Sequence, residues 1–369
     1  MSPDPSTVLL HAMPPPSPGD PAGSKLIMSS YLVSSGTAEA SDYLRGDHPN
    51  WRVVERGLGA LEEADAVLFA SGQAASHALL ADLARTHRRI VVPGDGYYNT
   101  RALAHLVGVA TGVEVRAVDL LDAAAVDGAV AVDDAALWVE TPTNPLLRVA
   151  DLARLGDICR RRGARMVADN TVATAVLQQP GRFGATATVY SLTKAAAGHS
   201  DLVLGAVVTR DGALADRLRE WRTLTGGIPG AFEAWLAARS LATLPLRLAA
   251  QSASALEIAR HLEHRDVVTA VHHPGLAPHR TVADRQMTGY GPLLSFEVAG
   301  GAAAADTVVA AAELIRPGTS FGGVVSSWER RARWPGESAP PGLIRLSVGV
   351  EGVADLIADI DGALTAAAG

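Results

Sequence analysis

The residues best suited to chemistry lie in two short segments, residues 169–171 and 191–194, each of which follows a β-rich run. The first segment carries Asp169, and the second carries Ser191, Thr193 and Lys194. Lys194 offers an amine for a Schiff base, the two hydroxyl groups can bind a phosphate, and Asp169 can pair with a protonated pyridine nitrogen. Because pyridoxal phosphate (PLP) needs these three kinds of group from a protein, the two segments predict a PLP site.

Lys194 precedes a run of small uncharged residues, 195–198. Partial desolvation there would lower the pKa of its amine and favour the neutral form that attacks a carbonyl. The alternative is a surface lysine, against which the neighbouring hydroxyl groups and Asp169 argue. Asp169 also has a structural alternative, because Asp-Asn-Thr after a strand is a common turn or helix cap. Its functional role would be to keep the pyridine nitrogen protonated, so that the ring accepts electrons.

A third segment, residues 71–73, reads Ser-Gly-Gln and lies between an apolar run at 66–70 and a helical run at 74–84. The backbone N–H groups and the positive dipole end of such a helix would suit a phosphate. An ordinary N-cap serine explains the same residues, and the segment taken alone favours that explanation.

These segments need a fold that brings them together, and residues 53–245 alternate short β-rich runs with helical stretches. Such alternation predicts an α/β large domain, the PLP-binding domain, with a mainly parallel, doubly wound sheet. The expected strands cover residues 89–92, 136–139, 166–169, 187–191 and 203–209. Ligands bind at the carboxyl ends of the strands in open α/β sheets, so the polar segments that follow these strands can converge on one crevice.

Residues 246–369 predict a smaller C-terminal α/β domain. Its expected helices cover residues 246–262, 303–315 and 353–368, and its expected strands cover residues 267–271, 293–298 and 343–348. The stretch 329–342 is rich in Pro, Gly and Arg, which predicts a surface loop or a margin of the active site. Prolines are concentrated in residues 1–21, which predicts an extended or disordered arm.

Composition argues against several classes of function. The 32 Lys and Arg against 39 Asp and Glu give a net charge of −7, so a small-molecule partner is expected and neither nucleic acid nor a membrane is. Neither a membrane-spanning run nor a signal peptide is evident, so a cytoplasmic location is expected. The single Cys159 is expected to be a buried structural thiol. The histidine pairs lack ligand spacing, so no metal site is predicted and they are expected at the surface: His261, His264, His272 and His273.

Several segments resemble, in order along the chain, the signature of the Cys/Met-metabolism PLP-dependent enzymes of fold type I. They cover residues 71–75, 95–100, 140–147, 169–174, 191–201, 320–323 and 343–349. This group comprises cystathionine γ-synthases, γ-lyases and β-lyases, and methionine γ-lyases. The resemblance extends from Tyr43 to Ile360, and the stretch 319–331 is most similar to actinobacterial sequences of the cystathionine γ-lyase type.

The resemblance implies a role for each matched residue. Lys194 would form the Schiff base, Asp169 would pair with the pyridinium nitrogen, and Tyr97 would stack on the ring and act as an acid/base group. Asn144 would lie near the ring hydroxyl and the substrate, and Arg345 would clamp the substrate α-carboxylate. The remaining residues implied are Ser71, Gly72, Gln73, Thr171, Ser191 and Thr193 for the cofactor and Ser320 for the substrate.

Tyr43 and Arg45 resemble the segment with which this family reaches the phosphate of the neighbouring subunit. The resemblance therefore implies that residues 1–52 form an arm that enters the partner's site. It also implies a homodimer with shared active sites, with a tetramer as the expected assembly.

The chain departs from the family pattern in ways that bear on the distal end of the substrate. Thr319 stands where many members that act at the γ-carbon carry glutamate, and the loop 325–342 is short. Leu44, His48 and Asn50 replace the usual serine, asparagine and threonine of the arm. A basic turn follows, and its cations either meet a distal carboxylate or form a solvated turn: Arg330, Arg331 and Arg333.

These observations predict γ-elimination of L-cystathionine to cysteine, 2-oxobutanoate and ammonia, with Tyr97 as a candidate proton donor to the leaving thiolate. One alternative is a cystathionine γ-synthase, which lets cysteine add to an activated homoserine. Another is a methionine γ-lyase, against which the absence of a cysteine near Tyr97 argues. A PLP-free binding protein of the same fold is the alternative from a different class, and the retained Lys194 and Asp169 argue against it.

Overall fold

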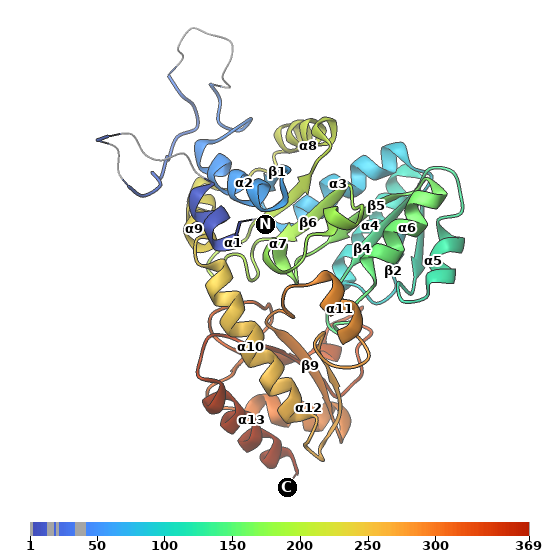
Figure 1. The fold of residues 1–369 in the computed structure, drawn as a ribbon, viewed down its shortest axis with the longest axis vertical. Coiled ribbons are helices and arrows are strands. Elements are labelled where there is room, and N and C mark those ends of the chain that lie inside the picture. Colours follow the sequence, from blue (N-terminus) through green and yellow to red (C-terminus); the bar gives the residue numbers. More distant parts are fainter. Residues whose placement is uncertain (1–2, 13–17, 20–21, 34–41, 369) are drawn as a thin grey trace.

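A computed structural model describes residues 3–12, 18–19, 22–33 and 42–368, and two β-sheets organise them (Figure 1). The larger sheet has seven strands in the order β1-β7-β6-β5-β4-β2-β3. The five strands from β6 to β3 run parallel to one another, and β7 runs antiparallel to both of its neighbours. The strands are β1 (Asp65–Phe69), β2 (Arg89–Pro93), β3 (Glu114–Val118), β4 (Ala135–Glu140), β5 (Arg165–Asp169), β6 (Ala187–Ser191) and β7 (Gly205–Thr209).

Helices cover both faces of this sheet, because side chains that alternate along each strand bury against different helices. On β1, Val67 and Phe69 pack with α3, α4 and α8, whereas Leu68 packs with α2 and α9. The predicted doubly wound α/β fold is therefore confirmed. The helices of this part are α2 (Pro49–Glu62), α3 (Gly72–Thr86), α4 (Tyr98–Thr111), α5 (Ala123–Ala129), α6 (Leu152–Arg162), α7 (Thr174–Leu177), α8 (Gly212–Thr225) and α9 (Ala231–Leu241).

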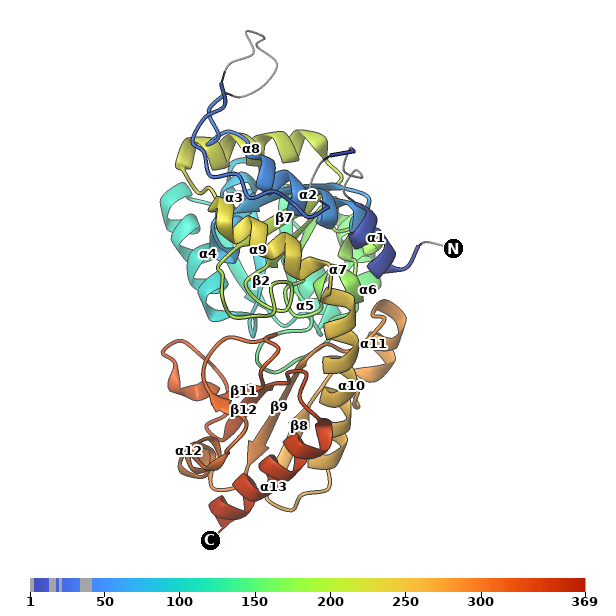
Figure 2. The same cartoon turned by 90° about the vertical axis from the view of Figure 1, so that its left-hand side faces the viewer.

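The smaller sheet has the order β10-β11-β12-β9-β8, and the long helix α10 (Leu244–Leu262) runs alongside it from the large sheet (Figures 1 and 2). Its core includes Phe296, Trp328 and Ile344, together with the inner faces of α10, α12 and α13. The strands are β8 (Val268–His272), β9 (Leu293–Val298), β10 (Arg316–Pro317), β11 (Ser327–Arg330) and β12 (Leu343–Ser347). The other helices are α11 (Arg280–Gln286), α12 (Gly301–Ala311) and α13 (Val353–Ala368). A domain boundary near residue 245 stays a prediction.

The predicted extended arm at residues 1–21 is wrong for α1 (Pro5–His11), which is a helix. Asp4 caps it by accepting from the Ser6 N–H at 2.8 Å, and Pro5 occupies a first-turn position that needs no N–H donor. Leu9 then buries against α2 in the same core as Trp51. The rest of that proline-rich prediction lies largely outside the described residues.

Two smaller expectations have clear outcomes. Cys159 is buried, as predicted, and burial raises the pKa of its thiol to about 11. His273 was expected at the surface, but it is only 1% exposed, and its Nδ1 accepts from the Gly275 N–H at 3.0 Å. The described part of the chain contains no helix with the length and apolarity to cross a bilayer, and no cluster of three or more metal-ligating side chains.

Candidate active site

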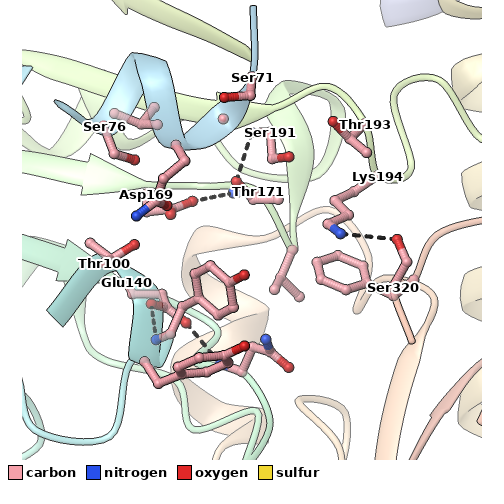
Figure 3. A pocket seen from close by; sticks show the side chains of 18 of the residues that line it. Ser71, Ser76, Thr100, Glu140, Asp169, Thr171, Ser191, Thr193, Lys194 and Ser320 are labelled. Atoms are coloured by element: carbon pink, nitrogen blue, oxygen red, sulfur yellow. Dashed lines mark hydrogen bonds between the residues drawn. The ribbon is translucent and has the colours of Figure 1, made fainter. Parts of the chain in front are cut away.

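A cavity of about 240 Å³ lies at the carboxyl ends of β4, β5 and β6 and is closed on its other side by residues 319–345 (Figure 3). The predicted convergence of polar segments after these strands is therefore correct. Of the predicted site residues, those that line the cavity are Ser71, Gly72, Gln73, Tyr97, Asn144, Asp169, Thr171, Ser191, Thr193, Lys194, Ser320 and Arg345.

Lys194 projects into this cavity from the turn after β6, and its Nζ donates to Ser320 Oγ at 2.9 Å. The amine also lies 5.2 Å from the centre of the Phe321 ring. Burial, followed by the positive charges of Arg345 and Arg331, lowers the pKa of Lys194 to about 8, and the negative charge of Glu329 opposes that shift. The expected direction of the shift is present, and the two arginines are a cause that the local sequence did not show.

Asp169 ends β5 and lies beside Glu140, its register partner at the end of β4. Its carboxylate accepts from the Thr171 N–H at 3.0 Å, and Thr171 Oγ1 in turn accepts from the Ser191 N–H at 2.9 Å. Burial raises the pKa of the Asp169 carboxyl, and the hydrogen bonds from Thr171 oppose that shift. Within the described chain, neither lysine nor arginine forms an ion pair with Asp169.

Glu140 joins two predicted site residues, although sequence reasoning gave it no role. Its Oε2 accepts from the Tyr97 N–H at 2.7 Å and its Oε1 from the Asn144 N–H at 2.9 Å. Burial, followed by the negative charge of Asp169, raises the pKa of Glu140 to about 8. An acidic residue at the end of an otherwise apolar strand, 135–139, was the signal that could have identified it.

The N-terminus of α3 forms another wall of the cavity. Ser71 is the N-cap and accepts from the Ala74 N–H at 3.0 Å, so the N-cap reading and the cavity-lining prediction both hold. Gly72 packs so tightly that an added Cβ would lie 2.6 Å from Ser191 Cβ. The free N–H groups of the first turn and the Ser191 hydroxyl are thereby held close together. The Thr193 hydroxyl donates to Leu204 O at 3.2 Å.

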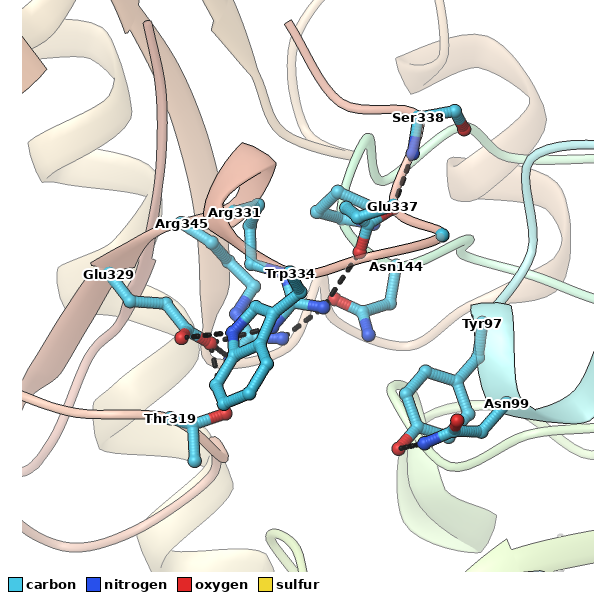
Figure 4. Close-up of polar contacts among 12 residues, drawn as sticks. Tyr97, Asn99, Asn144, Thr319, Glu329, Arg331, Trp334, Glu337, Ser338 and Arg345 are labelled. Carbon is cyan, nitrogen blue, oxygen red and sulfur yellow. Dashed lines mark hydrogen bonds and ion pairs between the residues drawn. The ribbon is translucent and has the colours of Figure 1, made fainter. Parts of the chain in front are cut away.

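On the opposite wall, Tyr97 Oη accepts from Asn99 Nδ2 at 2.9 Å (Figure 4). Arg345 is 3% exposed; its Nη1 donates to Asn144 Oδ1 at 2.8 Å and its Nη2 to Glu329 Oε1 at 2.9 Å. Burial lowers the pKa of Arg345 to about 10, so the guanidinium group stays charged at neutral pH.

Of the three arginines in the predicted basic turn, only Arg331 lines the cavity, and its side chain is 3% exposed. Arg330 pairs with Asp306 on α12, and Arg333 is 46% exposed. The solvated-turn alternative is therefore wrong for Arg331. Tyr98 and Glu140 also line the cavity; they belong to segments expected to converge there but were given no role of their own. Further lining residues without a predicted role are Ser76, Thr100, Val172, Val189, Val203 and Phe321.

Tyr43 and Arg45 do not line the cavity of their own chain. Tyr43 is 55% exposed, and Arg45 lies over its ring at 5.4 Å and donates to Thr223 O at 3.1 Å. Their position leaves a role in a neighbouring subunit as a prediction.

The chemistry of the lining residues fits PLP at three points. The first turn of α3 with Ser191 offers donors to a phosphate, and Asp169 is a partly buried carboxyl without a cationic partner in the described chain. Lys194 supplies an amine whose lowered pKa favours the neutral nucleophile.

Comparison with known proteins agrees with this chemistry. A sequence profile described as Cys/Met metabolism PLP-dependent enzyme matches residues 26–365. A protein named putative cystathionine γ-lyase from Streptomyces coelicolor is 40% identical over 86% of this chain and 82% of its own length. A cystathionine γ-synthase from Mycobacterium tuberculosis is 36% identical over 98% of this chain and 96% of its own. The crystal structure of a cystathionine γ-lyase, CalE6, from Micromonospora echinospora superimposes with a TM-score of 0.92 at 38% identity and covers 98% of both chains.

Proposed function

This chain belongs to the Cys/Met-metabolism PLP-dependent enzymes, and from that premise we propose that it catalyses γ-elimination of L-cystathionine to cysteine, 2-oxobutanoate and ammonia. The observation that carries the proposal is that the Lys194 amine, the Asp169 carboxyl and the Arg345 guanidinium line one cavity. The choice of a lyase is supported by the S. coelicolor relative, which bears that name and is more similar in sequence than the M. tuberculosis synthase.

The cofactor would be held by Lys194, Asp169, Ser191 and the first turn of α3, which begins at Gly72. Bound PLP supplies an electron sink, which lets a proton leave a carbon atom next to the substrate's amino group. Asp169 would favour that sink because its negative charge can pair with the ring nitrogen in a buried site. Arg345 would bind the substrate α-carboxylate.

Lys194 would move protons between the substrate's α- and β-carbons, because its amine reaches into the cavity and its pKa is lowered to about 8. Tyr97 would donate a proton to the leaving thiolate. Since Asn99 donates an N–H to the Tyr97 oxygen, the phenol's own proton is not used in that hydrogen bond and is available for the leaving group.

Product identification tests the reaction. Purified holoenzyme given L-cystathionine alone is expected to release 2-oxobutanoate, ammonia and cysteine in equal amounts, and Lys194→Ala is expected to release none. If cystathionine is left intact but forms when an activated homoserine and cysteine are supplied, the lyase proposal is wrong and a γ-synthase replaces it.

We also propose that Tyr43 and Arg45 complete the site of a partner subunit in a homodimer, with a homotetramer as the full assembly. Support comes from their location outside their own cavity and from the family resemblance of their segment. Co-expression of a Lys194 variant with an Arg45 variant tests whether arms cross between subunits.

A further inference from the structure

Glu329 is the centre of a charged cluster behind the cavity wall (Figure 4). It lies on β11 directly opposite Arg345 on β12, so the strand register places the two side chains on the same face of the sheet. Its Oε1 accepts from Arg345, Arg331 and Thr319, and its Oε2 accepts from Arg333 and Trp334. A carboxylate that already has five donors has no lone pair left for a ligand.

Glu329 therefore acts as a fixed anion for the arginines around it. Burial by itself raises its pKa, but the positive charges of Arg345 and Arg331 and the hydrogen bond from Trp334 outweigh burial and hold that pKa below its usual value. Glu337 is a second anion of the cluster, and its Oε2 lies 2.7 Å from Arg331 Nη2. The buried guanidinium groups of Arg331 and Arg345 thus face two buried carboxylates, whereas Arg333 is 46% exposed.

Arg331 and Arg345 share the same oxygen, Glu329 Oε1, at 2.6 and 2.9 Å, so their guanidinium groups lie side by side. Both side chains are 3% exposed, and both line the cavity. Each has five N–H donors, of which Arg331 uses two and Arg345 uses three in the hydrogen bonds of the described chain. The Nε of each is buried and has no hydrogen-bond partner among those residues. The pair therefore retains unused donors at the cavity wall.

This corner is adjacent to the amine of Lys194. Arg345 Cζ and Lys194 Nζ lie 5.4 and 5.2 Å from the centre of the same Phe321 ring. Ser320 also connects them, because its hydroxyl accepts from Lys194 and its carbonyl accepts from Arg345. A substrate whose α-carbon is within reach of Lys194 would have its α-carboxylate, rather than a distal group, at this corner.

We propose that Arg331 and Arg345 bind the substrate α-carboxylate together, and that Glu329 is the positioning residue that holds the two guanidinium groups in place. The inference rests on the proposed amino-acid substrate. It replaces the expectation that Arg331 meets a distal carboxylate. Arg331 and Arg345 donate to the same oxygen of Glu329, so Arg331 lies where the α-carboxylate is proposed to bind.

Binding of two small probes to the holoenzyme tests this proposal, with the absorbance of the bound cofactor as the readout. Glycine carries an α-carboxylate and no distal group, whereas methylamine carries no carboxylate. Arg331→Met is expected to raise the Kd for glycine by about tenfold to a hundredfold, the effect of losing a hydrogen bond to a charged group, and to leave the Kd for methylamine within about twofold. Arg331→Lys is expected to restore part of the glycine affinity.

Arg330→Met is the matched control, because Arg330 is the next residue and pairs with Asp306 rather than with the cluster. It is expected to bind both probes like the wild type. If Arg331→Met leaves Glu329 and Glu337 too poorly compensated to fold, Arg331→Met combined with Glu337→Gln removes one negative charge along with the positive one.

Three outcomes would overturn the proposal. Unchanged glycine affinity would show that Arg331 takes no part, and equal weakening of glycine and methylamine would show a purely structural role. If Arg331→Met weakened cystathionine binding and left glycine binding unchanged, Arg331 would bind the distal carboxylate of the substrate instead. A wild-type enzyme that yields no 2-oxobutanoate from cystathionine but shows Arg331-dependent glycine binding would refute only the proposed reaction.

Discussion

Substitution of Gly72 by alanine tests whether the wall formed by α3 and Ser191 holds the cofactor. The added Cβ would lie 2.6 Å from Ser191 Cβ and 2.8 Å from Ser191 Oγ. Favourable carbon–carbon contacts begin near ~3.5 Å, so the first turn of α3 and Ser191 would have to separate by about 1 Å. Both carry donors proposed for the phosphate, and a shift of that size moves at least one of them out of hydrogen-bond range.

Loss of one hydrogen bond to a charged group is worth about 1.5 to 3 kcal/mol, so the Kd for PLP is expected to rise roughly tenfold to a hundredfold. Helix propensity acts in the opposite direction, because alanine is favoured over glycine in a helix by about 1 kcal/mol. A weaker affinity would therefore report the steric conflict at Ser191 rather than an unstable α3.

The assay is an equilibrium titration of the cofactor-free protein with PLP, followed by absorbance. Gly212→Ala is the matched control: Gly212 is the first residue of α8, as Gly72 is of α3, and each follows a capping side chain. No atom lies within 4 Å of the Cβ that Gly212 would gain, so that variant is expected to bind PLP like the wild type. A Gly72→Ala variant that binds PLP as tightly as the Gly212→Ala control would refute the proposed phosphate wall.

Two further predictions concern the buried Glu62 carboxyl and the arm that carries Arg45. Burial raises the pKa of Glu62 to about 7 while its carboxylate accepts from Tyr190 Oη, so the folded state keeps a proton that the unfolded state loses above its ordinary pKa. The free energy of unfolding is expected to fall as pH rises from about 4.5 to 7. Glu62→Gln lacks this titration, so its free energy of unfolding should rise by about 3 kcal/mol relative to that of the wild type between pH 5 and pH 8. Urea unfolding at each pH measures the difference. Co-expression of Lys194→Ala with Arg45→Ala gives mixed dimers in half of the random pairings, and crossing arms would complete one of the two sites in each mixed dimer. About a quarter of the active sites are therefore expected to be restored. If activity does not exceed that of the separate variants, the arms do not cross.

Residues whose positions depend on one short segment were predictable from the sequence. Asp169 and Ser191 end adjacent parallel strands, so their convergence follows from the rule that ligands bind at the carboxyl ends of such strands. Lys194 lies in the turn immediately after Ser191 and shares that placement. The direction of its pKa shift was also accessible, because the residues that follow it are small and uncharged.

Features that depend on register or on long-range packing were not predictable in this way. The position of Glu329 opposite Arg345 requires the pairing of β11 with β12, and the sequence suggested only an irregular loop from 329 onward. Strand β3 was missed because it lies at the edge of the sheet and exposes Glu114, so it shows no continuous apolar run. Helix α1 was missed because the prolines in and around it suggested an extended chain, whereas burial of Leu9 stabilises the helix.

Three carboxyl groups near this cavity differ in protonation because their surroundings differ. Glu140 and Asp169 face each other, so burial and mutual repulsion favour the protonated form at least of Glu140, whose pKa rises to about 8. Glu329 is as deeply buried as Glu140, but guanidinium groups surround it and it stays ionised. The cavity therefore has two guanidinium groups at the Arg345 end and, at the Asp169 end, carboxyl groups that have no cationic partner in the described chain. A cation placed beside Asp169 would lower the pKa of both carboxyls there, and an anion placed beside Arg345 would meet guanidinium groups whose positions Glu329 already fixes. This polarity suits a ligand with a cationic ring at one end and a carboxylate at the other, with the Lys194 amine beside the carboxylate.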